Sequence, residues 1–154
     1  MTAGESGIVE SDWADSTDIT VNWGDMDSLG HVNHSVFARW METSRMKFFS
    51  DIGIMNLYES SNIGPILAKI EVDYKAPVIF PDVVNCKTSV SRIGRSSFDM
   101  AYVIRSSNQE NKIVAVGKVV CVLIDYTSGK PVEIPDTLRL SLIHISEPTR
   151  RYRI

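Results

Sequence analysis

The chain has 154 residues, of which 44% are hydrophobic and 23% charged, and these values are ordinary for one globular domain with its own core. Its net charge of −3 is unevenly distributed, because residues 1–18 carry five acidic side chains and no basic one, whereas residues 141–154 are net positive. The body between these ends is neutral, which disfavours a nucleic-acid-binding surface. No apolar run approaches the roughly 18 residues of a membrane span, and the first residues lack the apolar segment of a signal peptide.

The two cysteines, Cys86 and Cys121, lie inside apolar segments that have the character of strands. Their spacing matches neither a metal site nor a redox motif. We therefore expect two buried free thiols, which fits a protein of the reducing cytoplasm.

In chain order, residues 1–15 are acidic and aperiodic and are expected to form a flexible tail. Alternating β-branched residues predict a first strand over 16–23, and a polar turn follows it. From about His31 to Ile52 apolar residues recur every three or four positions, which predicts one long helix that ends at Gly53. After this helix we expect a loop, because serine, asparagine and glycine are frequent there.

From about residue 65 to 126 the sequence is typical of strands, with segments at 66–74, 83–93, 97–107 and 112–126. Prolines interrupt the stretch 75–82, and short turns connect the later strands antiparallel. Residues 135–142 predict a short helix with Asp136 as its cap. A single amphipathic helix buries its apolar face only against a sheet, so we expect an α+β fold with a long central helix wrapped by a five-stranded antiparallel sheet. The uncovered edges and second face of that sheet predict a homo-oligomer.

The turn before the long helix combines two carboxylates, Asp25 and Asp27, with two glycines and two histidines. The first N–H groups of a helix have no partner inside it, and the helix dipole adds partial positive charge. Such an end stabilises negative charge that develops during a reaction. One aspartate is therefore a candidate helix cap, and the other is a candidate nucleophile or general base for acyl-group hydrolysis. A plain capped turn is the alternative.

Two other chemistries fit this turn less well. His31, His34 and Asp27 are possible metal ligands, but no third histidine or cysteine supports them, so no metal and no cofactor are expected. A Ser-His-Asp triad is also disfavoured, because the sequence contains no G-x-S-x-G motif.

The stretch from Val21 to Phe49 resembles the signature of the hotdog-fold acyl-CoA thioesterases of the 4-hydroxybenzoyl-CoA thioesterase type. That signature is a strand, then D-x-D-x-x-G-H-V-N, then an aromatic residue and E-x-x-R on the helix. The resemblance extends from about residue 17 to 140. The matching residues are Asp25, Asp27, Gly30, His31, Val32, Asn33, Phe37, Glu42 and Arg45.

By this resemblance Asp27 is the catalytic carboxylate, and backbone amides at the helix start polarise the thioester carbonyl. The amides concerned belong to the segment Gly30, His31, Val32, Asn33 and His34. The family usually has asparagine or an aromatic residue at the position of His34, so the adjoining substrate pocket departs from the pattern.

A second polar segment, Ser96 and Ser97 after Arg95, matches the one that closes the site of the neighbouring subunit in such enzymes. A plain hairpin turn is the alternative interpretation. Arg92, Arg95 and Lys75 are candidate contacts for coenzyme A phosphates, although solvated surface charge explains each of them as well.

From Ser141 the sequence SLIHISEPTRRYRI no longer resembles the family and instead resembles a translated sequencing adapter. We therefore expect a thioesterase domain over 16–140 and a non-native tail over 141–154, whose arginines have no evolved role.

The resulting hypothesis is an acyl-CoA thioesterase that cleaves a fatty or aryl thioester, with the acyl group between helix and sheet. Its substrate partner is acyl-CoA or acyl carrier protein, and it is expected to be a homodimer or homotetramer. The alternative is a hotdog module that binds acyl-CoA or acyl carrier protein without cleaving. A hotdog dehydratase ranks last, because no suitably placed histidine and acid pair is found.

Overall fold

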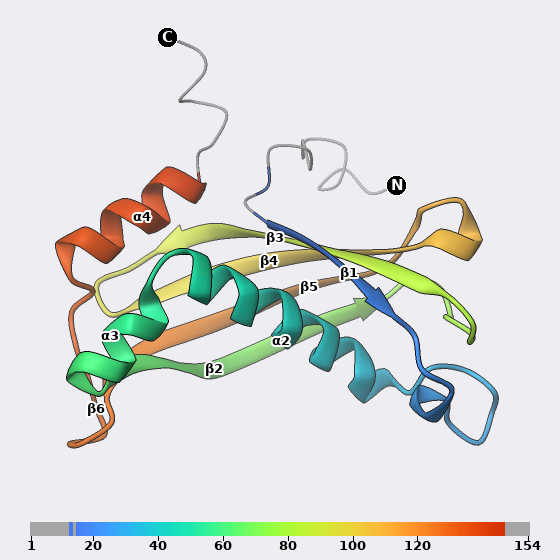
Figure 1. Cartoon of the computed structure of the whole chain (residues 1–154), viewed down its shortest axis with the longest axis horizontal. Coiled ribbons are helices and arrows are strands. Elements are labelled where there is room, and N and C mark those ends of the chain that lie inside the picture. Colours follow the sequence, from blue (N-terminus) through green and yellow to red (C-terminus); the bar gives the residue numbers. More distant parts are fainter. Residues whose placement is uncertain (1–12, 14, 147–154) are drawn as a thin grey trace, which may run out of the picture.

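A computed structural model describes residue 13 and residues 15–146 of the chain (Figure 1). A curved antiparallel sheet is its main element. The strands are β1 (Asp15–Thr20), β2 (Ile63–Tyr74), β3 (Val83–Ile93), β4 (Ser97–Ser106) and β5 (Lys112–Asp125). They lie in the order β1-β3-β4-β5-β2, and a two-residue strand β6 (Lys130–Pro131) pairs with the end of β5. The predicted five-stranded sheet is thus confirmed, with one short strand added.

One long helix, α2 (His34–Asp51), lies across the concave face of this sheet (Figure 1). It begins three residues later than the apolar pattern predicted, because the segment before it forms the polar turn. Its buried face presents mainly large apolar residues to the core: Val36, Phe37, Trp40, Met41, Phe48 and Phe49. The sheet contributes Phe98, Met100, Tyr102 and Ile104 to the same core. These side chains alternate along β4 and are at most 1% exposed.

The expected loop after the long helix is wrong, because residues Ile54–Ser61 form a second helix, α3. Two left-handed residues, Gly53 (φ 80°) and Asn62 (φ 57°), flank it. Ile54 is completely buried, so packing against the core stabilises this short helix in a segment where serine, asparagine and glycine suggested a loop.

The last helix, α4 (Asp136–Ser146), continues past the predicted domain boundary at residue 140. Leu138 and Leu142 of α4 are buried in the core, so one residue of the segment expected to be non-native contributes to packing. Residues 147–154 and most of the expected N-terminal tail lie outside the described residues. At the other end β1 begins at Asp15, whose buried carboxylate pairs with Lys47 of α2.

Cys86 and Cys121 are buried and unpaired, as predicted. Burial raises the pKa of the Cys86 thiol to about 12 and that of Cys121 to about 11, so both thiols are protonated at neutral pH. Among residues 15–146, no helix is both long enough and apolar enough to cross a membrane.

Candidate functional site

The polar turn begins with a short 3-10 helix, η2 (Trp23–Asp25), which Asp25 closes. Oδ2 of Asp25 accepts a hydrogen bond of 2.8 Å from the backbone N–H of Asn22, and its carbonyl accepts one of 2.9 Å from Asn33. The carboxylate of Asp25 is therefore occupied in holding the turn together. The cap of α2 itself is Asn33, whose Oδ1 accepts a hydrogen bond of 3.0 Å from Ser35 N–H, so neither aspartate caps the long helix.

The side chain of Asp27 accepts the hydrogen bonds that hold the second half of the turn. Oδ1 accepts a hydrogen bond of 2.9 Å from Leu29 N–H and a longer one of 3.4 Å from His31 N–H. Gly30 adopts φ 80°, the left-handed conformation that lets the chain reverse here. Within the described part of the chain, Oδ2 of Asp27 accepts no hydrogen bond. One oxygen thus fixes the carboxylate, and the other is available to a ligand.

The backbone amides that the sequence singled out do not all remain available. The N–H groups of His31, Val32 and Asn33 donate to the Asp27 carboxylate, the Val78 carbonyl and the Asp25 carbonyl. The N–H of His34, the first residue of α2, has no acceptor among the described residues. The N–H of Gly30 donates to the Asp27 carbonyl at 3.1 Å, so within the described residues the predicted group of five amides narrows to one free donor, at the positive end of the helix.

Tyr74, the last residue of β2, belongs to the same site, although sequence reasoning missed it. Its hydroxyl donates a hydrogen bond of 3.0 Å to the carbonyl of His34, and its ring meets that of Phe37 edge-on at 5.1 Å. Burial raises the pKa of the Tyr74 hydroxyl, which keeps it protonated as a donor at neutral pH. A lone tyrosine at the end of a strand gives no signal of this contact in the sequence.

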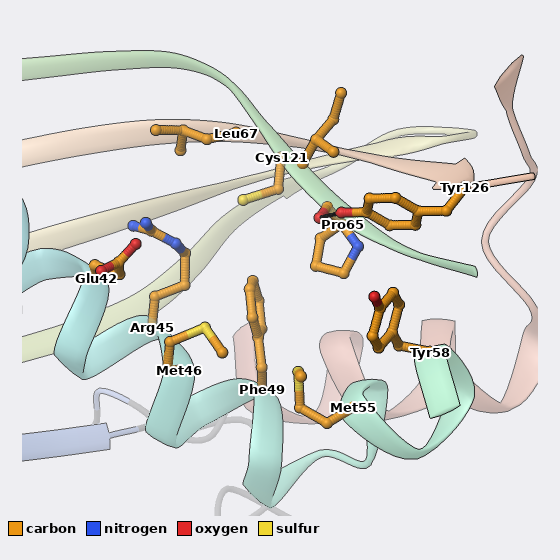
Figure 2. A pocket seen from close by; sticks show the side chains of 11 residues that line it. Glu42, Arg45, Met46, Phe49, Met55, Tyr58, Pro65, Leu67, Cys121 and Tyr126 are labelled. Atoms are coloured by element: carbon orange, nitrogen blue, oxygen red, sulfur yellow. Dashed lines mark hydrogen bonds between the residues drawn. The ribbon is translucent and has the colours of Figure 1, made fainter. Parts of the chain in front are cut away.

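A pocket of about 300 Å³ lies further along α2, between that helix, α3 and β2 (Figure 2). Glu42 and Arg45, the E-x-x-R pair of α2, line one part of it. The rest is mostly apolar and is formed by Met46, Phe49, Met55, Tyr58, Pro65, Ile66, Leu67, Cys121 and Tyr126. A half-open cavity thus exists in the region between helix and sheet where the sequence hypothesis placed the acyl group.

The segment Arg95, Ser96 and Ser97 is not part of the site around Asp27 in the same chain. The loop from β3 to β4 lies at one end of the sheet, and the turn after β1 lies at the other (Figure 1). Oγ of Ser97 accepts a hydrogen bond of 2.9 Å from Arg92, and the side chain of Arg95 is 85% exposed. The part of the chain that the structure describes contains no cluster of three or more metal-ligating side chains.

Comparison with known proteins places the chain in a family. Residues 21–142 match the model of the thioesterase-like superfamily. The chain is 32% identical over 124 residues to the chloroplastic acyl-acyl carrier protein thioesterase ATL3 of Arabidopsis thaliana, covering 78% of this chain and 63% of that protein. It is 22% identical over 126 residues to the long-chain acyl-CoA thioesterase FadM of Escherichia coli, covering 82% and 95%.

The fold also resembles the folds of solved structures. A thioesterase from Thermus thermophilus, solved with coenzyme A and zinc, superimposes with a TM-score of 0.76 at 28% identity, over 88% of this chain and 96% of that one. The predicted hotdog fold and the predicted class, thioester hydrolase, are confirmed by these relatives. The chain belongs to the thioesterase-like superfamily.

Proposed function

We propose that this protein hydrolyses acyl-CoA thioesters, with Asp27 as the reacting carboxylate and the N–H of His34 as the oxyanion donor. The observation that carries the proposal is that the segment between β1 and α2 offers, as far as residues 15–146 show, both a carboxylate oxygen that accepts no hydrogen bond and an amide that donates none. Fixed donors aimed at developing negative charge are the largest single contribution in many enzymes.

Two reaction routes use these groups. In the first, Oδ2 of Asp27 attacks the thioester carbonyl, the thiolate leaves, and water hydrolyses the mixed anhydride. In the second, Asp27 takes a proton from a water molecule, which attacks the carbonyl directly. In both, the His34 N–H and the dipole of α2 stabilise the tetrahedral oxyanion, and the products are a carboxylic acid and a thiol.

An apolar strip on β2 supports an extended acyl group as substrate. Leu67, Ile70 and Tyr74 are paired with the inward-facing residues Cys121, Val119 and Ala115 of β5, so they share the face that carries α2. An irregularity between Leu67 and Lys69 keeps Leu67 and Ile70 on this face despite their odd spacing. The three side chains are 44%, 38% and 48% exposed. The strip leads from His34 to the pocket, and we propose that a fatty or aryl acyl group lies along it.

We further propose a homodimer, alone or as half of a homotetramer, that pairs through β2. This strand is an edge of the sheet, and its exposed apolar residues are unusual on a free edge. A two-fold antiparallel pairing of two β2 strands directs the β3–β4 loop of one chain toward the Asp27 end of the other. Ser96, Ser97 and Arg95 then contribute to the neighbouring site. The buried free thiols support a cytoplasmic location.

The test of this function is the release of coenzyme A from short-chain, long-chain and aromatic acyl-CoAs by the full chain. Turnover on any of them supports the enzyme and gives its substrate class. Tight binding of every acyl-CoA without turnover supports the alternative, a binding module that does not cleave.

A further inference from the structure

Arg45 of α2 is a buried cation that lines the pocket. Arg45 is 8% exposed, and one N–H donates to the Tyr102 hydroxyl at 3.3 Å. No carboxylate among the described residues forms an ion pair with it. The remaining donors of Arg45 are not shut off from solvent, so they face the pocket, where a ligand can accept hydrogen bonds from them.

Glu42 lines the pocket beside Arg45 but forms no ion pair with it within 4 Å, and three other neighbouring groups are uncharged. Burial raises the pKa of Tyr102 and of Cys86 to about 12 and that of Cys121 to about 11, so all three are neutral at pH 7. Arg45 lines the pocket between α2, α3 and β2, which gives its remaining donors access to a ligand.

The pocket has a polar end and an apolar end. The guanidinium of Arg45 and the carboxylate of Glu42 lie at one end of the view, Phe49 stands in the middle, and the rings of Tyr58 and Tyr126 lie toward the other end (Figure 2). Arg45 supplies donors only, and Glu42 supplies acceptors only. A hydroxyl group satisfies both, because it accepts from the first and donates to the second. A carboxylate ligand fits less well, because Glu42 repels it.

The position of this polar end sets the place of the hydroxyl along the substrate. Glu42 and Arg45 lie eight and eleven residues after His34 on the same helix. These spacings correspond to about 12–16 Å, the length of roughly ten to thirteen carbons in an extended chain. The apolar end of the pocket then accommodates the carbons beyond the hydroxyl.

We infer that the pocket selects long-chain acyl groups with a hydroxyl near the middle of the chain, held between Arg45 and Glu42. This inference rests on the proposed thioesterase function for its substrate orientation. It makes Arg45 a specificity residue, distinct from the reacting groups Asp27 and His34.

The experiment compares 12-hydroxystearoyl-CoA with stearoyl-CoA and with dodecanedioyl-CoA, whose terminal carboxylate is at carbon 12, as substrates of the full chain. We expect kcat/KM at least tenfold higher for the hydroxylated chain, and we expect Arg45→Met and Glu42→Ala to abolish that preference. Arg39→Met, an exposed arginine on the same helix, is the matched control and should retain it. Equal rates on stearoyl-CoA, or a preference for the dicarboxylic chain, would overturn the inference.

Binding of the free acids separates this inference from the proposed reaction. We expect 12-hydroxystearate to bind the full chain at least tenfold more tightly than stearate, whether or not any thioester is cleaved. Tighter binding of 12-hydroxystearate without cleavage of any acyl-CoA would contradict the proposed hydrolysis and support the hydroxyl-binding pocket. Cleavage of acyl-CoA without tighter binding of 12-hydroxystearate would support the hydrolysis and overturn the hydroxyl-binding pocket. Glu42 is exposed, so Glu42→Ala keeps the test decisive if Arg45→Met does not fold.

Discussion

The hydroxyl of Tyr74 donates a 3.0 Å hydrogen bond to the carbonyl of His34, and this contact joins the end of β2 to the first turn of α2. It fixes the residue whose N–H is the proposed oxyanion donor. Tyr74 is therefore a positioning residue that acts through His34.

Removing this hydroxyl should change the rate more than the binding of substrate. For Tyr74→Phe we expect kcat to fall about threefold to tenfold with KM nearly unchanged, and the free energy of unfolding to fall by about 1 kcal/mol. Steady-state kinetics with one acyl-CoA and urea unfolding measure the two effects. Thr43→Val, which removes an exposed hydroxyl of α2 bonded to Arg39, is the control. A rise in KM with unchanged kcat would contradict this role.

Gly30 is the residue of the turn with a left-handed backbone conformation. We expect a substitution at Gly30 to destabilise the protein through backbone strain and not through a steric clash. A Cβ at Gly30 meets no atom within 4 Å, but φ is 80°. Gly30→Ala should therefore destabilise the protein by about 1–2 kcal/mol and lower activity through the displaced Asp27. Gly24→Ala is the matched control, because a Cβ there also meets nothing and φ is not positive. Equal unfolding free energies for the two variants would refute the explanation.

The pH dependence of stability should reflect Asp99 of β4. Burial alone would raise its pKa, but hydrogen bonds and charges from Arg92 (2.9 Å) and Lys118 (3.4 Å) outweigh burial and hold the pKa below its usual range. A carboxyl with a lowered folded pKa stabilises the fold above its unfolded pKa of about 4, and this contribution is lost as the pH falls through the folded pKa.

Asp99→Asn should therefore cost about 1 kcal/mol at pH 7 and less at pH 3. Urea unfolding of both proteins across this range measures the difference. A cost that is independent of pH would show that the Asp99 charge does not contribute.

Because β2 is an apolar edge strand, we predict that the protein is a homodimer or a homotetramer in solution. Sedimentation should give a particle of twice 17.2 kDa or of four times that mass. Ile70→Lys, which places a charge in the apolar strip, should raise the dissociation constant of the dimer at least tenfold. Thr20→Lys on the opposite edge strand β1 is the control and should leave assembly unchanged. A monomeric wild-type protein would contradict the proposed pairing.

Much of the fold could be predicted because local pattern and tertiary packing agree. The segment 83–93 alternates so regularly that β3 has the predicted bounds, and the apolar spacing of the long helix matches α2. Helix α3 was missed, because the serine, asparagine and glycine of residues 53–64 favoured a loop. Ile54, Leu57 and Tyr58 do recur at helical spacing, but over only two turns, and the burial of Ile54 that stabilises the helix is a tertiary contact.

The sequence predicted where the candidate site lies, but it did not predict which of its side chains are hydrogen-bonded within the turn and which are available to a substrate. The motif drew attention to residues 25–34, but only the folded turn distinguishes Asp25, which holds Asn22, from Asp27, which keeps one oxygen free. Tyr74 reaches His34 across 40 positions of sequence, and nothing local in the chain indicates that contact.

The central claim is tested most directly by coenzyme A release from the best acyl-CoA by wild type, Asp27→Asn and Asp25→Asn. Asparagine retains Oδ1, which accepts from Leu29 at residue 27 and can replace the acceptor for Asn22 at residue 25, so both variants should fold. We expect Asp27→Asn to lose about 10²–10⁴-fold in kcat, and Asp25→Asn to lose less than about tenfold. Full activity in Asp27→Asn, or a greater loss in Asp25→Asn, would show that the reacting carboxylate is not Asp27.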